Sequence, residues 1–192
     1  STDKRGNTTQ YQYDARGNVT QTTDALGGVV RVSYDSQNDP LTVTNQRNFT
    51  TTFGYDANGN LLTITDARAA LTRFTYDAYG QVTGITDAEG RATPVEYDAV
   101  GNLKKITDAL TRSTSFNYDL VSRMTDVTDP RSATTRVHYD AADNPTDFTD
   151  HLGNVTRLTY DAVGNRLTVT DAKNNTTAFQ YDRRNLLVRT TN

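Results

Sequence analysis

Residues 55–67 read YDANGNLLTITDA, and 105 residues later residues 160–172 read YDAVGNRLTVTDA. The Tyr-Asp pair recurs every 21 residues in nine copies, without insertion or deletion. The tyrosines are Tyr13, Tyr34, Tyr55, Tyr76, Tyr97, Tyr118, Tyr139, Tyr160 and Tyr181. A fixed period of this size indicates a repeat architecture. We therefore expect residues 1–192 to form a single array of nine repeats that is part of a longer chain or assembly.

Each repeat predicts two strands and two turns. In TRFTYD (72–77), Thr72, Phe74 and Tyr76 alternate with Arg73 and Thr75, which is the period of a β-strand. The segment NLLTIT (60–65) predicts a second strand, and no segment has a helical period. The expected fold is all-β: tandem 21-residue β-hairpins that form one long antiparallel sheet of roughly 18 strands.

Both turns have a residue signature. The position four residues after the tyrosine holds glycine in five copies and another small or polar residue in the rest: Gly17, Gly59, Gly80, Gly101 and Gly164, then Asn38, Ser122, Asp143 and Asn185. Gly and Asn tolerate a positive φ, so we expect a left-handed turn position there. The second turn begins at Thr-Asp, where residues such as Asp66, Asp87 and Asp108 can accept backbone N–H groups two residues on.

The odd length of the repeat has a structural consequence. With even-length turns, a period of 21 would exchange the two faces of the sheet at every repeat. A β-bulge or a three-residue turn must absorb one residue, and we expect a bulge near Thr63, Gly84 and Lys105. Open sheets rarely exceed about ten strands without curling, so the array should coil into a spiral, tube or shell wall.

The composition limits the classes of function. Only 34 % of residues are hydrophobic, but 11 Tyr and 6 Phe are too many for a disordered chain. The absence of cysteine excludes disulfides, thiolate metal sites and a cysteine nucleophile. The net charge of −3, without a basic stripe, argues against nucleic acid, and no run of 18 apolar residues predicts a membrane span.

The stretch YDANGNLLTITDARAALTRFTYD (55–77) resembles the RHS/YD repeat, and the resemblance extends over essentially the whole chain. It implies a β-hairpin strip that spirals into a hollow shell. Such shells enclose a toxic polypeptide in bacterial polymorphic toxins and insecticidal toxin complexes, and serve recognition in teneurin-like surface proteins. The toxin members carry an Asp-Pro-x-Gly signature that releases the cargo. Here Asp39-Pro40 and Asp129-Pro130 lack the glycine, so no protease role carries over.

The repeated aspartates and tyrosines and the two histidines are the candidates for binding or catalysis, and structural roles explain them more simply. Rows such as Asp66, Asp87 and Asp108 could bind Ca²⁺, but closure of each turn by its own carboxylate is the favoured interpretation. The repeated tyrosines would allow a surface glycan as partner. His138 and His151 occupy different phases of the repeat, and no matched triad accompanies them. We expect no catalytic residues, no cofactor, no metal and no enzyme activity.

We therefore expect a structural shell module of a secreted or cell-surface protein, bacterial in origin, that encloses or presents a toxin or effector segment. The alternative is an extracellular filament or adhesin. Residue 192 has the same phase in the repeat as residue 3. The last strand, near 186–190, could therefore pair with the first strand, near 7–13, of another copy. Neither terminus carries a capping element. Either further repeats of the same chain or identical chains placed end to end would continue the sheet.

Overall fold

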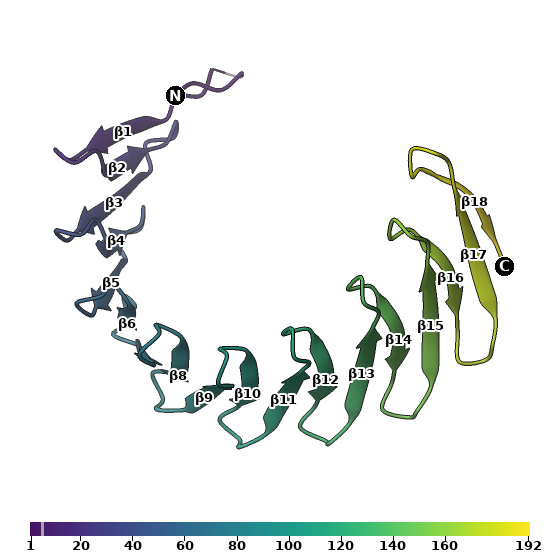
Figure 1. Cartoon of the computed structure of the whole chain (residues 1–192). Coiled ribbons are helices and arrows are strands. Elements are labelled where there is room, and N and C mark those ends of the chain that lie inside the picture. The colour runs from purple at the N-terminus through teal and green to yellow at the C-terminus, as the bar shows by residue number, and fades with distance from the viewer. Residues whose placement is uncertain (5) are drawn as a thin grey trace. The chain divides into compact units, whose positions relative to one another are not determined.

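The computed structural model describes residues 1–4 and 6–192, which contain strands and turns but no helix (Figure 1). This confirms the predicted all-β class and the number of strands. The strands are β1 Gln10–Tyr13, β2 Val19–Thr23, β3 Val29–Tyr34, β4 Pro40–Thr44, β5 Thr50–Tyr55, β6 Leu61–Thr65, β7 Leu71–Tyr76, β8 Val82–Thr86, β9 Ala92–Tyr97, β10 Leu103–Thr107, β11 Ser113–Tyr118, β12 Met124–Thr128, β13 Thr134–Tyr139, β14 Pro145–Thr149, β15 Val155–Tyr160, β16 Arg166–Thr170, β17 Thr176–Tyr181 and β18 Leu187–Thr191.

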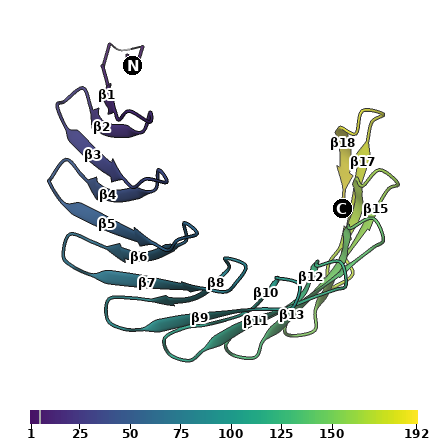
Figure 2. The same ribbon diagram turned by 60° about the vertical axis from the view of Figure 1, so that its left-hand side comes forward.

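Each strand is antiparallel to its neighbours in sequence. The chain divides into two compact units, Ser1–Pro94 and Val95–Asn192. Within the first unit, β1 to β8 follow one another in chain order (Figure 2). Within the second, β10 to β18 do the same (Figure 1). Consecutive hairpins therefore build each unit without any crossover connection.

The strand boundaries differ by one to three residues from those that the sequence suggests, and β7 covers Leu71–Tyr76 instead of 72–77. The first strand, expected over 7–13, is β1 at Gln10–Tyr13, while Thr8 forms an isolated bridge with Thr2. Asn7 belongs to a turn instead, because its carbonyl accepts from the N–H of Asp3 and its own N–H donates to the Asp3 carboxylate. Asn60, expected in a strand, bonds to Asp56 in the same way. From β2 to β18, the residue before the strand completes the preceding turn.

Two kinds of hairpin alternate along the chain. In the TD hairpin, the two strands flank a Thr-Asp turn and pair without interruption, as Thr65↔Leu71 and Ile64↔Thr72 do. In the YD hairpin, the strands flank a Tyr-Asp turn and the register shifts by one residue next to the tyrosine. Tyr55 faces Leu61 while Gly54 faces Thr63, so Leu62 is the unpaired residue.

The same shift places Thr83 and Lys104 outside the pairing of the next two YD hairpins. The bulge predicted near Thr63, Gly84 and Lys105 is therefore confirmed, one residue earlier in each case. It absorbs the odd residue of the 21-residue period, so the two faces of the sheet keep their identity from repeat to repeat.

One face carries the aromatic and aliphatic side chains, and we call it the tyrosine face. It comprises each Tyr of a Tyr-Asp pair, the residue two before it, and their partners six and nine residues after it, as in the pairs Tyr76↔Val82 and Phe74↔Ile85. The opposite face, the threonine face, carries pairs such as Arg73↔Thr86 and Thr75↔Gly84. The bulge is what brings residues six and nine after the tyrosine onto one face.

Within each unit the sheet is a single layer without a conventional core. Among the described residues none is buried, whether hydrophobic or polar. Apolar side chains of the tyrosine face are instead half-buried against one another, and some are largely open, such as Tyr13 at 60 % exposure. No helix long and apolar enough to cross a membrane occurs in the described part of the chain. Stability must come from ladders between adjacent strands, as in other repeat proteins.

Candidate functional surface

The two turns of each repeat have the same backbone structure. In the Tyr-Asp turn at Asp56, the N–H of Gly59 donates to the Asp56 carbonyl and the N–H of Asp56 donates to the Asn60 carbonyl. In the Thr-Asp turn at Asp87, Gly90 and Arg91 make the equivalent bonds. This is a turn closed by a residue in the left-handed region, the usual form of a three-residue hairpin loop. The residue patterns of the two turns had suggested different structures.

The predicted positive φ is confirmed in all nine Tyr-Asp turns. The values are 90° at Gly17, 84° at Gly59, 80° at Gly80, 92° at Gly101, 87° at Gly164, 72° at Asn38, 65° at Ser122, 66° at Asp143 and 62° at Asn185. The Thr-Asp turns have it at the matching position, for example 78° at Gly90 and 63° at Ala69. Gly is therefore the favoured residue there because it has no Cβ to clash.

Each turn aspartate closes its own loop. The Oδ1 atom of Asp56 accepts from the N–H of Asn58 at 2.8 Å and of Asn60 at 2.9 Å, and its Oδ2 accepts from the Asn60 amide at 2.9 Å. The bond from the Asn60 side chain, followed by that from its backbone, lowers the pKa of Asp56. The pKa of Asp171 is lowered in the same way by Asn175. The bond two residues on was predicted, whereas the bond four residues on was not.

The hydrogen bonds of the turn aspartates bear on whether rows of them could bind Ca²⁺. Asp66 accepts from the N–H groups of Arg68 and Ala70, and Asp87 and Asp108 make the same pair of bonds within their turns. In Asp108 the second oxygen also accepts from the Arg112 guanidinium at 2.8 Å. Within residues 1–4 and 6–192, no group of three or more acidic or histidine side chains converges on one point. The carboxylates of these three residues are engaged in turn closure.

The repeated tyrosine ties neighbouring hairpins together. The hydroxyl of Tyr76 donates to the carbonyl of Leu61 at 2.8 Å, 15 residues earlier in the chain. That carbonyl precedes the unpaired Leu62 of the previous YD hairpin. Four further bonds have the same spacing: Tyr34 to Val19, Tyr55 to Pro40, Tyr139 to Met124 and Tyr181 to Arg166. Burial, with Asp39 and Asp35 nearby, raises the pKa of the Tyr55 hydroxyl.

This contact gives the tyrosine a role beyond packing, because it satisfies a carbonyl next to a bulge. A hydrogen bond of this kind contributes about 0.5–1.5 kcal/mol. It also couples one repeat to the next, which is the nearest-neighbour term that stabilises a repeat array.

A second tie joins some successive Tyr-Asp turns. The asparagine five residues after the tyrosine donates to the side chain at the left-handed position of the next turn: Asn18 to Asn38 at 2.8 Å, Asn102 to Ser122 at 3.1 Å and Asn165 to Asn185 at 3.0 Å. In one repeat Arg123 replaces the amide. It pairs with Asp119 in its own turn and with Asp143 in the next, both at 2.7 Å. Its guanidinium also lies 4.8 Å from the centre of the Tyr139 ring.

The threonine face is polar and carries cross-strand ion pairs in the second unit. Lys105 contacts Glu96 at 3.2 Å, and Arg136 contacts Asp126 at 3.1 Å. His138 lies on this face, where its Nδ1 is 2.7 Å from Asp147. His151 lies in the turn after β14 and is exposed. The two histidines therefore have separate surroundings, as their different phases in the repeat suggested.

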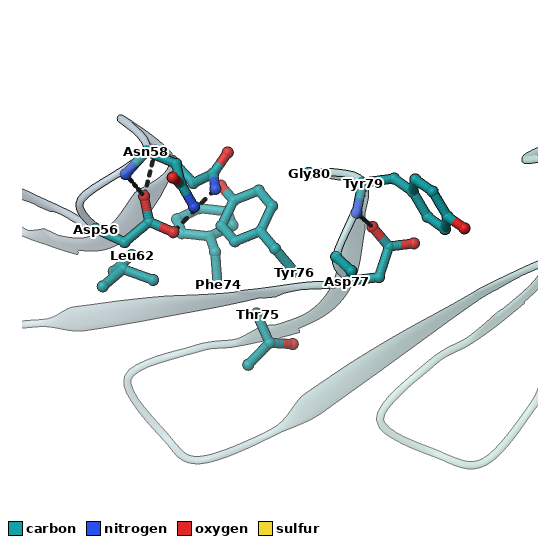
Figure 3. Close-up of a pocket in the computed structure, with 11 residues that line it drawn as sticks. Asp56, Asn58, Leu62, Phe74, Thr75, Tyr76, Asp77, Tyr79 and Gly80 are labelled. Atoms are coloured by element: carbon teal, nitrogen blue, oxygen red, sulfur yellow. Dashed lines mark hydrogen bonds between the residues drawn. The ribbon is translucent and has the colours of Figure 1, made fainter.

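One shallow pocket of about 640 Å³ lies in the first unit, between the turns at Asp56 and Asp77 (Figure 3). Its carboxylates are already bonded to backbone N–H groups, Asp77 to those of Tyr79 and Gln81. Tyr79 is 90 % exposed and points away from the Asp56 turn (Figure 3). The pocket therefore has the polar groups of two ordinary turns, and we assign it no ligand.

Two roles escaped the sequence analysis: the hydroxyl bond of the tyrosine and the amide bond of the residue five after it. The second had a signal, because Asn occupies that position at 18, 60, 102, 144 and 165. An amide next to an Asx turn can bond both its own turn and a neighbour. The first had no local signal, because its acceptor lies 15 residues away.

Comparison with solved structures supports the fold. The chain aligns with a chain of the Photorhabdus luminescens Tc holotoxin pore carrying the TccC3 mutation D651A, at a TM-score of 0.68 and 18 % identity, over 95 % of this chain and 12 % of that chain. A TcdB2-TccC3 structure without its hypervariable C-terminal region aligns at a TM-score of 0.59 and 21 % identity, over 95 % of this chain and 10 % of that one. The chain thus spans about a tenth of the length of these structures. No curated protein sequence matches it significantly.

Family models account for nearly the whole chain. The RHS Repeat model matches residues 1–29, and the Teneurin YD-shell model matches residues 33–192. The second match takes in eight of the nine tyrosines of the Tyr-Asp pairs. This chain belongs to the Teneurin YD-shell family and is built from RHS/YD repeats.

Proposed function

We propose that this chain is a length of wall in a secreted or cell-surface shell that encloses a polypeptide, such as a toxin segment. Residues 1–192 would form one array of nine repeats within a longer chain or assembly. The role is structural, and we propose no catalytic step for it.

The observation that carries the proposal is that, within each unit, the described residues form a single-layer sheet with one apolar face and no second layer. A sheet needs another surface over its apolar face to gain from burial. An enclosed chain with exposed apolar side chains would supply that surface. The solved structures similar in fold are components of Tc toxins. We therefore propose that the tyrosine face lies on the enclosed side and the threonine face on the outer side.

The first test is negative-stain electron microscopy of the native, unfragmented protein, together with its mass. Closed hollow particles of defined mass are expected. Long tubes with an axial repeat would overturn the shell in favour of an end-to-end filament.

A second test determines which face is enclosed. The chain has no cysteine, so Thr72→Cys places a unique thiol on the tyrosine face and Thr75→Cys places one on the threonine face. In the native protein, a maleimide attached to a large polymer should label the second variant and not the first. In urea it should label both, which controls for thiol reactivity. Equal labelling in the native protein would reject the proposed orientation.

A further inference from the structure

Pro94 occupies an unusual place for proline, since it lies in the middle of β9, with β8 on one side and β10 on the other. Proline has no N–H and is normally confined to edge strands, first residues or bulges of a sheet. Pro40 and Pro145 follow that rule as the first residues of β4 and β14, and Pro130 lies in a turn. Only at Pro94 is the missing donor in mid-strand.

The turn at Asp87 shows toward which strand Pro94 would have donated. The N–H of Asp87 donates to the Arg91 carbonyl, so these two form a hydrogen-bonded pair. In an antiparallel ladder, bonded and non-bonded pairs alternate. Thr86↔Ala92 is therefore non-bonded, Ile85↔Thr93 is bonded and Gly84↔Pro94 is again non-bonded. The backbone of Pro94 thus faces β10, where the donor is needed.

The pairing of β9 with β10 shows the effect. In the other eight YD hairpins, the residue three before the tyrosine pairs with the threonine ten after it, as in Thr52↔Thr65, Arg73↔Thr86 and Ser115↔Thr128. The corresponding pair would be Pro94↔Thr107. The β9–β10 ladder instead stops at Val95↔Ile106.

We infer that Pro94 is a built-in weak point of the array and that the sheet opens first between β9 and β10. In a repeat protein each strand is held by its neighbours alone, so a missing ladder bond is not compensated by packing elsewhere. Local opening then has a lower free energy there than in equivalent hairpins. Residues on either side of the break should unfold as separate blocks. This inference does not depend on the proposed shell function.

Native-state hydrogen exchange followed by mass spectrometry tests the inference. The amides of β10 should exchange faster than those of β12, the equivalent strand one repeat later. Pro94→Thr introduces the residue found at this phase as Thr52 and should slow exchange in β10 roughly three- to tenfold, the value of one backbone hydrogen bond. Urea unfolding should show two transitions in the parent protein, and these should move together in the variant.

Matched variants separate the missing donor from a general effect of proline. Ser115→Pro has the same phase and should speed exchange in β12, while Pro130→Ala should leave β10 and β12 unchanged. The inference is overturned if β10 is as protected as β12 in the parent protein. It is equally overturned if Pro94→Thr leaves exchange in β10 unchanged.

Discussion

The YD hairpin and the TD hairpin close with the same turn but pair their strands differently. Asp56 and Asp87 make equivalent backbone bonds, and the left-handed position follows three residues later in both. Only the YD hairpin has an unpaired residue, and only its tyrosine reaches back to the preceding repeat. The structure of the turn and the pairing register of its two strands are therefore independent of each other in this fold. The turn is repeated twice per period, whereas the bulge occurs once and makes the period odd.

The largest expected effect comes from single-residue deletions in the two kinds of strand. Deleting Leu62 removes the unpaired residue but keeps every pair of its hairpin, so we expect a folded protein that loses about 1 kcal/mol. Deleting Thr72 from the uninterrupted TD pairing would put Arg73 opposite Ile64 and exchange the faces of all later strands. We expect a loss of more than about 3 kcal/mol. Urea unfolding monitored by circular dichroism gives both values, and equal losses would contradict the assignment of Leu62 as the unpaired residue.

The next effect tests whether the two turns are equivalent. Gly101→Val and Gly90→Val each place a β-branched residue at a positive φ, 92° and 78°. Each should cost about 1–3 kcal/mol. Thermal melting compares them, with Asn185→Gly as a control that should not destabilise its turn. An unchanged melting curve for Gly101→Val would reject the turn assignment, and a large difference between the two glycine variants would show that the turns differ.

A smaller effect is expected when the tyrosine hydroxyl bond of the YD hairpin is removed. Tyr76→Phe keeps the ring and removes the bond to the Leu61 carbonyl, so it should cost about 1 kcal/mol. Tyr79→Phe is the matched control, because that side chain is 90 % exposed and should not affect stability. The two free energies of unfolding are measured in urea. If the two variants were equally stable, the hydroxyl bond would contribute nothing to coupling between repeats.

The smallest effect at neutral pH concerns the turn carboxylates. Asn45 already replaces Asp in one Thr-Asp turn and accepts the same two N–H bonds, so Asp56→Asn should keep its turn closed. The variant loses the Oδ2 acceptor of the Asn60 side chain, so its melting temperature at pH 7 should fall slightly. The folded pKa of Asp56 is below the ordinary value of 3.8. Its ionised form therefore adds stability above that value, and this is lost as pH falls through the folded pKa.

The parent protein should accordingly lose stability below about pH 4, where turn aspartates take up protons. The Asp56→Asn variant should lose less over the same range, since one of these groups no longer titrates. Melting temperatures between pH 7 and pH 2 measure the difference. Identical pH profiles would show that the Asp56 bonds do not favour the charged form.

Local features of the fold could be predicted from the sequence with small errors. The position of each strand was correct to within one to three residues, because alternation of side chains is visible in a single strand such as 72–76. The left-handed turn position was predictable because Gly and Asn recur at one phase. The bulge was predictable from arithmetic: an odd period cannot keep its faces without an unpaired residue. The equivalence of the two turns was missed, although both have Asp three residues before the left-handed position.

The sequence by itself determined the repeat, the strands, the two faces and the need for one bulge per period, since these depend on residues close together in the chain. The tertiary structure alone decided which carbonyl Tyr76 bonds, which turn Asn18 reaches and toward which strand Pro94 presents its missing donor. These contacts join residues 15 to 20 positions apart or depend on the direction of a ladder bond. Both are set by the pairing register of neighbouring strands, which no single strand carries in its own sequence.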